Sequence, residues 1–390
     1  MKILFTSENY YPRISGVPVV VQYLAEGLAD RKHCVAVATQ QPPGTSSQEL
    51  LNGVNIYRFP IFLDWKHSFR GSKKAYVDFI LSYDADIVII ECTECITTDL
   101  LLPHLCKIKG KVIFHTHGFS GFDNKVFSIK DSLRHTFGTT YNWFNSKVYF
   151  NYTLKKAIKY IDAFMCLSEV DSGLNYIKQF AKKYYILDNA ADNMFFDASC
   201  CQLDMLSKYT SLENRQFMMS CANYTVVKNQ LGLIKQYYRS NASKRMSLVC
   251  IGSQKNSYYN DCIEQVSELE KKYGHRDVKL LQGVKREDIP AIVNKASLYL
   301  VSSSWEQYSI SIIEAMSQGV PFISTNVGNA RLLPGGMTIE CIDEMHIAID
   351  TLMHDNSKYK IYSEAGRKFA YDNCRIEVAV DKLEKILYEN

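Results

Sequence analysis

The sequence predicts an α/β protein made of two domains, each built around a parallel β-sheet. Its 390 residues are enough for two hydrophobic cores of ordinary size. Apolar runs of strand length alternate with stretches of helical spacing along both halves of the chain. The clearest unit spans residues 296–328, where a strand pattern, a serine-rich loop, a helix ended by Gly319 and a second strand follow one another. This order is typical of half of a parallel sheet.

The composition is that of an ordinary globular protein, and it argues against several other classes. Hydrophobic residues make up 47% of the chain and charged residues 22%, as in most water-soluble proteins. The net charge of +4 is too small to indicate nucleic-acid binding. No apolar run approaches the ~18 residues of a spanning helix, and the apolar start at residues 3–5 is too short for a signal peptide. The 12 cysteines have no framework spacing, so we expect reduced thiols in a cytosolic protein.

The first half of the chain predicts one of the two sheets. Residues 2–6 form the expected first strand, and residues 19–31 form a helix with one apolar face, after a loop that contains Gly16. No G-x-G-x-x-G fingerprint occurs here, which disfavours a dinucleotide-binding oxidoreductase. Further strands are expected at residues 34–38, 54–59, 86–90, 111–114 and 162–167, with a helix at residues 73–82.

The strand at residues 111–114 leads into a histidine pair, His115 and His117. Two histidines at the end of a strand are compatible with a metal site or with a simple turn. No glutamate or cysteine nearby completes a metal set, so we expect no metal here. Cys92 and Cys95 form a lone C-x-x-C, and without a second pair we expect thiols at a strand end rather than zinc ligands.

Residues 119–160, the aromatic–basic segment, combine many aromatic rings with an excess of cations. Rings and cations together suit a membrane interface, where rings lie at headgroup depth and cations meet anionic lipid. A helix packed into the core with a solvated basic face explains the same composition, and both interpretations stay open. The segment carries the rings Phe119, Phe122, Phe127, Phe137, Tyr141, Trp143, Phe144, Tyr149, Phe150 and Tyr152, and the cations Lys125, Lys130, Arg134, Lys147, Lys155, Lys156 and Lys159.

The second half repeats the alternation after a linker or insertion at residues 197–213. Helical stretches at residues 230–238 and 263–273 separate the apolar runs, and the chain is helical after Ile347. Alternating strands and helices make a second parallel α/β domain. Its strands are expected at residues 217–221, 247–251, 278–281 and 298–301.

Two carboxylates follow the strand at residues 298–301. Glu306 lies in the loop, and Glu314 lies eight residues later, about one turn into the next helix. In open parallel sheets, ligands bind beyond the carboxyl ends of the strands, and helix N-termini there favour anions. A carboxylate can accept two neighbouring hydroxyls, so an anion site beside a diol site indicates a nucleotide. The alternative is structural: Ser311 to Glu314 also fits a capping box, in which Glu314 caps only the backbone.

The spacing from Glu306 to Glu314, followed by Ala-Met-Ser-Gln-Gly-Val-Pro, closely resembles the E-x7-E signature of the retaining glycosyltransferases of family 4. The resemblance covers nearly the whole chain and implies the GT-B fold, in which two Rossmann-like domains face each other across a cleft. Asn189 and Asp192 match the P-N-G-V-D run at the family's domain junction. We therefore expect an acceptor-side domain at residues 1–190, a nucleotide-sugar-binding domain at 191–375, and a C-terminal helix at 376–390 that crosses back to the first domain.

The resemblance also implies which residues hold the donor. Glu314 would bind the ribose hydroxyls, and Glu306 together with the amides of Ser309 to Ser311 would hold the transferred sugar and the phosphates. Lys228 matches the lysine of the family's G-R-x-x-x-x-K motif, in which both cations clasp the diphosphate, whereas Asn223 stands in the position of the arginine. Arg331, which follows Gly328, is the candidate for the missing charge.

The first domain would contribute Gly16, whose backbone approaches the donor phosphates or the sugar, and His117, close to the sugar and the acceptor. Catalytic roles would thus fall to Glu306, His117 and Lys228. The remaining donor contacts would come from the loop and the first turn of the helix: Tyr308, Ser309, Ile310 and Ser311.

The resemblance implies a metal-independent glycosyltransferase without a cofactor, which takes a nucleotide sugar to a glycan or lipid-linked glycan acceptor. The aromatic–basic segment suggests a lipid-linked acceptor at the inner face of the cytoplasmic membrane, as in bacterial O-antigen or capsule assembly. Two alternatives remain: a nucleotide-sugar epimerase of the same fold, and a degenerate, non-catalytic partner subunit of another transferase.

Overall fold

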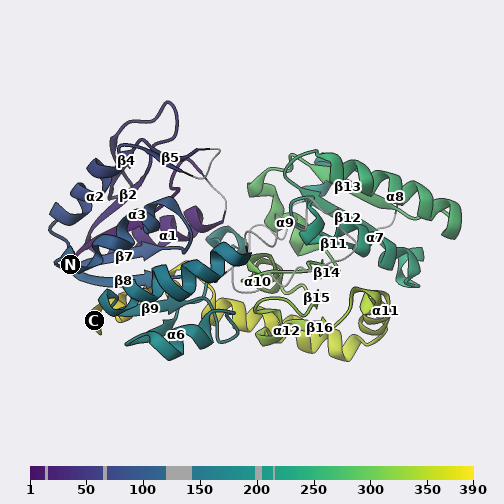
Figure 1. Ribbon diagram of the computed structural model, residues 1–390. Helices are drawn as coiled ribbons and strands as arrows, with labels where there is room; N and C mark the ends of the chain where they lie inside the picture. The colour runs from purple at the N-terminus through teal and green to yellow at the C-terminus, as the bar shows by residue number, and fades with distance from the viewer. Residues whose placement is uncertain (14–15, 65–67, 120–142, 198–203, 214–215) are drawn as a thin grey trace. The chain divides into compact units, whose positions relative to one another are not determined.

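The computed structural model describes every residue except 14–15, 65–67, 120–142, 198–203 and 214–215 (Figure 1). The chain divides into two compact units. The first contains Met1–Asn189 and Ala379–Asn390, and the second contains Ala190–Val378. Each unit has its own sheet, so the expected two-domain α/β architecture is present. Much of the aromatic–basic segment, including Lys125 and Arg134, lies outside the described residues.

The first sheet is parallel except at one edge, where β3 runs antiparallel to β4. Its order is β10-β9-β8-β7-β1-β2-β4-β3. The order changes direction between β1 and β7, which makes that point the switch point of this sheet. The strands are β1 (Lys2–Ser7), β2 (Cys34–Gln40), β3 (Gln48–Leu51), β4 (Val54–Phe59), β7 (Ile87–Glu91), β8 (Lys111–His115), β9 (Ala163–Cys166) and β10 (Tyr184–Ile186), beside a separate hairpin of β5 (Ile61–Leu63) and β6 (Phe69–Gly71).

Helical segments cover the first sheet, and their boundaries follow local sequence signals. Helix α1 begins two residues earlier than expected because Pro18 is accepted in the first helical turn, where its missing N–H has no partner to lose. A π-helical turn at Tyr149–Leu154 continues into α5 (Lys155–Ala157). The principal helices are α1 (Val17–Asp30), α2 (Lys73–Ser82), α3 (Ile96–Leu101), α6 (Leu174–Phe180) and α13 (Ile376–Tyr388).

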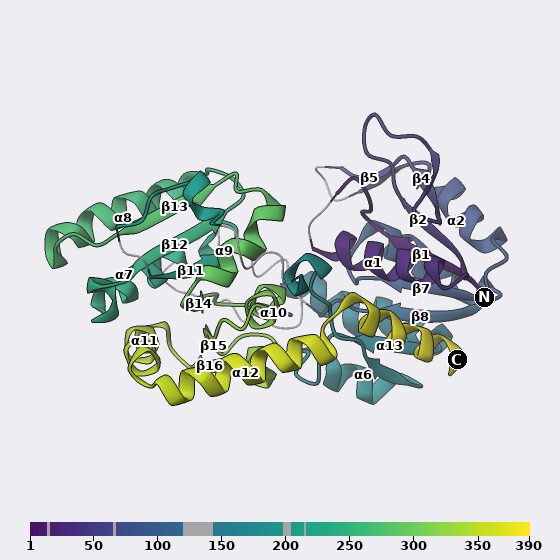
Figure 2. The same cartoon turned by 180° about the vertical axis from the view of Figure 1, so that it is seen from behind.

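The last helix, α13, packs on the first unit through specific contacts (Figure 2). Gly27 of α1 leaves room for Val380, because a Cβ at Gly27 would come within 2.5 Å of that side chain. Arg31 donates to Glu384 at 2.9 Å, and the ring of His33 lies 2.7 Å from the same carboxylate. Gly27 and Arg31 therefore allow α1 to bind α13, although Arg31 and Glu384 are more than 300 positions apart in the chain.

The second sheet is wholly parallel, with the order β13-β12-β11-β14-β15-β16. Its direction changes between β11 and β14. The sequence did not predict β16, a short edge strand that begins with a glycine. The strands are β11 (Phe217–Cys221), β12 (Ser247–Gly252), β13 (Val278–Gln282), β14 (Leu298–Val301), β15 (Phe322–Thr325) and β16 (Gly336–Ile339).

The central strands of this sheet are buried on both faces. Met218 of β11 lies in one core cluster and Met219 in the other. Leu298 and Tyr299 of β14 divide in the same way, as the two-residue period of a strand requires. Two covered faces explain why these strands read as continuous apolar runs instead of alternating ones.

The helices of the second unit cover both faces of its sheet. Helix α8 begins six residues before the expected position because Asn256 caps it, accepting a hydrogen bond from the Tyr259 N–H at 2.9 Å. The principal helices are η8 (Val226–Lys228), α7 (Gln230–Arg239), α8 (Ser257–Tyr273), η10 (Arg286–Asp288), α9 (Ile289–Lys295), α10 (Ile310–Ser317), η11 (Ala330–Leu332), α11 (Met345–His354) and α12 (Asn356–Asn373). Among the helices that the structure describes, none combines the length and the apolar character needed to cross a membrane.

Candidate functional site

The switch point of the second sheet gathers most of the predicted donor residues. Neighbouring strands β11 and β14 continue into loops at the same edge, because parallel strands share their carboxyl ends. The loop after β11 carries Lys228 in η8, and the loop after β14 carries Glu306. Open parallel sheets bind ligands at such a point.

Lys228 and Glu306 form an ion pair at this edge. The Lys228 ammonium donates to Glu306 Oε1, and the Ser303 hydroxyl donates to the same oxygen at 2.7 Å. Ser302 Oγ donates to the Lys228 carbonyl at 2.8 Å, which ties the two loops together. The Lys228 side chain is 29% exposed and the Glu306 side chain 14% exposed. The structure thus brings together two predicted residues that are 78 positions apart in sequence.

The backbone around Lys228 is defined by two caps. Thr225 accepts a hydrogen bond from the Lys228 N–H and begins η8. Asn229 then adopts a left-handed conformation with φ of 53°, and its side chain accepts from the Gly232 N–H at 3.2 Å to begin α7. Asparagine tolerates this conformation better than most residues. The turn between the caps places the lysine at the carboxyl edge of the sheet.

Glu314 is buried and pairs with a residue that the sequence did not single out. The Arg286 guanidinium donates to Glu314 Oε1, and Arg286 Cζ lies 4.8 Å from the centre of the Phe195 ring. Although burial opposes the charge of Arg286, Glu314 raises the pKa of the guanidinium. A signal was present, since Arg286 is a cation just after β13 and Gly283, at the same edge of the sheet.

The capping-box interpretation of Glu314 is wrong. Helix α10 begins at Ile310, so Ser311 is its second residue and does not occupy the N-cap position. Ser311 instead shares a hydrogen bond with Tyr299 of β14. With the N-cap excluded, Glu314 is a buried carboxylate held by a half-exposed guanidinium.

The N-terminus of α10 has polar groups available for a ligand. Ser309, the N-cap, makes no side-chain capping bond, and its N–H donates to Asn329 Oδ1 at 2.9 Å. The Nδ2 group of Asn329 is buried without a hydrogen-bond partner among the described residues. Tyr308 is half-buried beside the core, and Ile310 opens the helix. Helix N-termini with unpaired amides favour anions.

Asn223 and Arg331, the other two predicted donor residues, are not members of the two ion pairs. Asn223 is exposed, and its Oδ1 accepts from Ser253 Oγ at 2.6 Å. Arg331 is exposed on η11. The contacts recorded for the described residues do not join Arg331 to Lys228 or to either glutamate. Its expected role as the second diphosphate cation therefore stays a prediction.

Two predicted residues lie beyond the carboxyl ends of strands in the first sheet, Gly16 in the loop after β1 and His117 just after β8. Gly16 precedes α1 with φ of 67° and ψ of −138°, a conformation that L side chains rarely adopt. A Cβ at Gly16 would meet no atom within 4 Å, so the backbone conformation, not crowding, requires glycine. His117 follows β8 with φ of 51° and lies buried.

His117 contacts Glu91, a residue that no sequence motif singles out. His117 Nε2 lies 2.5 Å from Glu91 Oε2, and His115 Nδ1 lies 3.1 Å from the same oxygen. Burial lowers the pKa of His117 to about 4. Burial opposes the charge of Glu91 as well, but the two histidines outweigh it and lower the pKa of Glu91 to about 2.

The stated reason for expecting no metal at the histidine pair was wrong. Glu91, His115 and His117 offer ligand atoms that all lie within 4.8 Å of one another. Glu91 was missed because it ends β7 and lies 24 positions before His115 in sequence, although parallel pairing sets the two side by side. A polar residue that ends a neighbouring strand was the available signal.

Comparison with known proteins identifies both units. A model described as "Glycosyltransferase Family 4" matches residues 14–172, and one described as "Glycosyl transferases group 1" matches residues 204–369. The N-acetyl-alpha-D-glucosaminyl L-malate synthase of Bacillus anthracis is 22% identical over 97% of this chain and 95% of its own length. The O-antigen chain mannosyltransferase B of Escherichia coli is 26% identical over 38% of this chain and 40% of its own length.

Solved structures share the fold over the whole chain. The sucrose-phosphate synthase of Thermosynechococcus elongatus matches 100% of this chain and 98% of its own, with a TM-score of 0.71 and 13% identity. Anabaena HepE in complex with UDP and glucose matches 100% of both chains, with a TM-score of 0.70 and 17% identity. These structures show the GT-B fold. The two family models, which between them match residues 14–172 and 204–369, show that the chain belongs to the family 4 glycosyltransferases.

Proposed function

We propose that this glycosyltransferase retains the configuration of the sugar that it moves from a nucleotide-sugar donor to a glycan or lipid-linked glycan. The observation that carries the proposal is the arrangement at the second switch point, where the Lys228–Glu306 pair and the buried Glu314 flank the N-terminus of α10. The complex of HepE with UDP and glucose supports a nucleotide-sugar donor.

In this proposal each side chain has a separate task. Glu314 accepts the two ribose hydroxyls, and the first-turn amides of α10, from Ile310 onward, hold the phosphates. Lys228 offsets the charge that develops on the leaving diphosphate. Glu306 orients the sugar. His117 and Gly16 act on the reacting groups from the first domain.

Retention needs no carboxylate nucleophile in this proposal. The C–O bond between the anomeric carbon and the diphosphate breaks while the acceptor oxygen forms its bond on the same face of the sugar. The acceptor proton passes to an oxygen of the leaving diphosphate. The protein lowers the barrier to this step in two ways. It holds the donor and the acceptor in position, and it places a cation beside the leaving diphosphate.

Turnover of a panel of UDP-, GDP- and ADP-sugars tests the proposal. With a glycan or lipid-linked glycan acceptor present, we expect release of a nucleoside diphosphate together with a product whose anomeric configuration matches the donor. An epimerase would convert the donor with no acceptor present. A degenerate partner subunit would leave every donor unchanged. This alternative stays open because Asn223 stands in the position of an arginine.

Arg331→Ala is expected to weaken the binding of a nucleoside diphosphate more than that of the free nucleoside. The reason is that Asn223 carries no charge, which leaves Lys228 and Arg331 as the proposed partners of the diphosphate. Calorimetric titration with UDP and uridine, or with the matching guanosine or adenosine pair, measures both affinities. Equal losses for both ligands would remove Arg331 from the site.

Transfer is expected to continue in EDTA, because the proposed phosphate partners are lysine, arginine and helix amides instead of a metal ion. The measurement is the initial rate after treatment with EDTA and desalting. Loss of turnover that magnesium or manganese restores would contradict metal independence.

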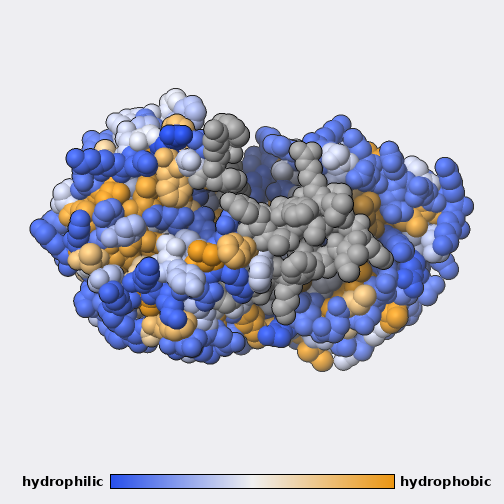
Figure 3. Space-filling model, viewed as in Figure 1, coloured by the Kyte–Doolittle hydropathy of each residue, from blue (hydrophilic) through white to orange (hydrophobic). Residues whose placement is uncertain are grey.

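We infer that the acceptor is presented at the inner face of the cytoplasmic membrane, in bacterial surface-polysaccharide assembly. The name of the mannosyltransferase relative supports the pathway. The surface of the first unit supports membrane contact, because hydrophobic patches lie among hydrophilic side chains on the face seen in Figure 3. Part of the aromatic–basic segment packs in the core, as Phe119 and Phe150 do, whereas Tyr152 is 63% exposed and Tyr160 is 39% exposed. The exposed rings are the ones that could contact a membrane in this proposal.

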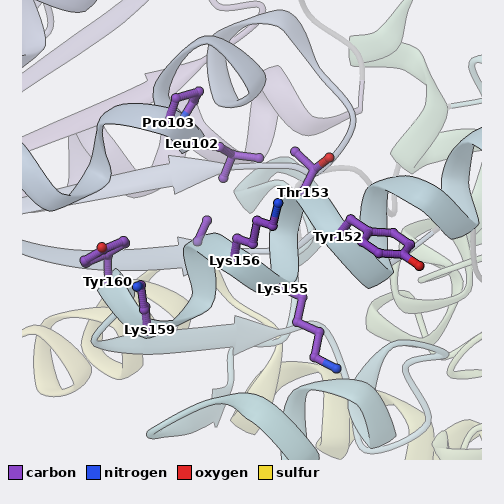
Figure 4. A pocket seen from close by; sticks show the side chains of 9 residues that line it. Leu102, Pro103, Tyr152, Thr153, Lys155, Lys156, Lys159 and Tyr160 are labelled. Carbon is purple, nitrogen blue, oxygen red and sulfur yellow. The ribbon is translucent and has the colours of Figure 1, made fainter.

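A pocket of about 580 Å³ combines the exposed rings and cations of this segment (Figure 4). Leu102 and Pro103 line it on the opposite side from the lysines. Cations beside an apolar floor suit an anionic headgroup attached to acyl chains. Its remaining lining residues are Tyr152, Thr153, Lys155, Lys156, Ala157, Lys159 and Tyr160.

The chain is expected to bind anionic vesicles, and binding should weaken as salt rises. Each cation near the surface contributes ~1 kcal/mol within a screening length of about 10 Å. A variant with Lys147, Lys155, Lys156 and Lys159 changed to Gln should stay in the supernatant of a vesicle co-sedimentation assay while retaining nucleotide binding.

The control changes four lysines of the second unit, Lys235, Lys244, Lys271 and Lys272, to Gln and therefore removes the same charge. It should still pellet with the vesicles. If both variants pellet like the wild type, or if the wild type stays in solution at low salt, membrane contact through this segment is wrong.

A further inference from the structure

Glu91, His115 and His117 form a buried cluster where the neighbouring strands β7 and β8 of the first sheet end. Glu91 ends β7 and His115 ends β8, and the parallel register pairs these two residues directly. His117 follows two positions later. The side chains of Glu91 and His115 are fully buried, and that of His117 is 4% exposed.

Protein contacts leave this cluster with unmet hydrogen-bonding capacity. Both ring nitrogens of His115 and Oε1 of Glu91 are buried without a hydrogen-bond partner among the described residues. His115 Nδ1 lies 3.1 Å from Glu91 Oε2, but the geometry of that contact is not a hydrogen bond. An unmet buried polar group costs about 1–3 kcal/mol. Three such atoms in one place indicate that a further partner completes the cluster.

The backbone turns His117 toward the same point. Its φ of 51° lies in the left-handed region, where a non-glycine residue is uncommon and costs about 1–3 kcal/mol. This turn brings the two imidazole rings to a centroid distance of 3.9 Å, and the donor atoms of all three residues lie within 4.8 Å of one another. One ring nitrogen from each histidine and one carboxylate oxygen of Glu91 therefore lie close together.

We propose that Glu91, His115 and His117 bind a zinc ion, with the fourth coordination position open to water or a ligand. Two imidazoles and one carboxylate suit zinc, which such donors bind at about 2.0–2.2 Å. Magnesium and calcium prefer sites made of oxygen ligands and are therefore poor candidates. The spacing of the donor atoms requires only small side-chain movements to surround one ion.

Zinc at this position would inhibit transfer, an effect that rests on the proposed function because it assumes that His117 serves the sugar. The metal would occupy His117 Nε2, the nitrogen that now contacts Glu91. Binding itself does not depend on that assumption. The site is consistent with transfer that persists in EDTA, since removal of zinc would free His117.

Titration of the full chain, stripped of metal, with zinc and with cobalt(II) tests the site. We expect one zinc per chain by calorimetry, and a cobalt visible spectrum of a four-coordinate ion without the intense near-ultraviolet band of thiolate ligation. The spectrum matters because Cys92 and Cys95 lie close by. His115→Gln and Glu91→Gln should each weaken zinc binding at least about tenfold.

A matched control is His275→Gln. His275 also contacts two carboxylates, those of Glu213 and Glu270, but it is exposed and binds them through opposite ring nitrogens. Its replacement should leave zinc affinity unchanged. Thermal melting shows whether each variant is folded. If a variant does not fold, the cobalt spectrum of the wild type decides whether the proposed ligands bind the metal.

Three outcomes would overturn the site: no zinc bound by the wild type, a thiolate band in the cobalt spectrum, or unchanged affinity in folded His115→Gln and Glu91→Gln. If zinc binds as predicted but does not slow transfer, the zinc site stands and the proposed role of His117 is wrong.

Discussion

Lys228→Ala is expected to lower the rate of transfer by about 10²–10³-fold, the loss seen when one preorganised group that stabilises a developing anion is removed. Lys228 is the cation that the structure places at the switch point of the second sheet, against Glu306. Its removal would also leave the Glu306 carboxylate without its cation, beside the position proposed for a diphosphate. Both consequences slow departure of the leaving group. The measurement is the initial rate at saturating donor.

Lys235→Ala is the matched control, because Lys235 is an exposed lysine on α7 in the same domain. It should transfer at the wild-type rate. Lys228→Arg keeps the charge and should retain part of the activity. If Lys228→Ala transfers as fast as the wild type while remaining folded, Lys228 does not act on the diphosphate.

Glu314→Ala should weaken nucleotide binding about 10–150-fold, since a hydrogen bond to a charged group contributes ~1.5–3 kcal/mol and each 1.4 kcal/mol is a factor of ten. The thermal stability of the protein should change little. Arg286, the partner of Glu314, is 47% exposed and can regain water when the carboxylate is lost. Calorimetric titration with the nucleotide and a thermal melt give the two quantities.

Glu287→Ala is a control from the same region, since Glu287 lies on η10 next to Arg286 and is 69% exposed. It should bind nucleotide normally. Unchanged affinity in Glu314→Ala together with a lower melting temperature would mean that Glu314 has a structural role only, through its ion pair with Arg286.

The alternation of strands and helices could be predicted from the sequence, because a strand buried on both faces is a continuous apolar run. The strand Leu298–Val301 is an example. Short edge elements gave no such signal. The strand Gly336–Ile339 begins with a glycine directly after Gly335, and most of it is only partly buried, so no apolar run marks it. Helix starts depended on caps: Asn256 lies before a mostly polar turn and was not recognised.

The site was predictable where one motif spans it and unpredictable where its contacts cross the sheet. Glu306 and Glu314 were found from their spacing. Arg286 was not, because it reaches Glu314 from the loop after another strand, 28 positions away. Glu91 was missed for the same reason, since strand pairing, not sequence distance, places it beside the histidines.

Backbone conformation was the other obstacle. His117 takes a left-handed conformation that its residue type does not announce, and only this turn directs its ring at Glu91. The capping-box prediction failed because the pattern was present in the sequence but lay at the wrong position in the helix. The S-x-x-E spacing at Ser311 is correct for a cap, but the N-cap is Ser309, two residues earlier, and local sequence alone does not fix that boundary.

The most direct measurement is the structure of the full chain with the nucleoside diphosphate that stabilises it most in a thermal-shift comparison of UDP, GDP and ADP. The account predicts that the ribose hydroxyls contact Glu314, and that the diphosphate lies between the Lys228 ammonium and the N-terminus of α10. A nucleotide held on the first domain, or one whose ribose and diphosphate avoid both residues, would contradict it.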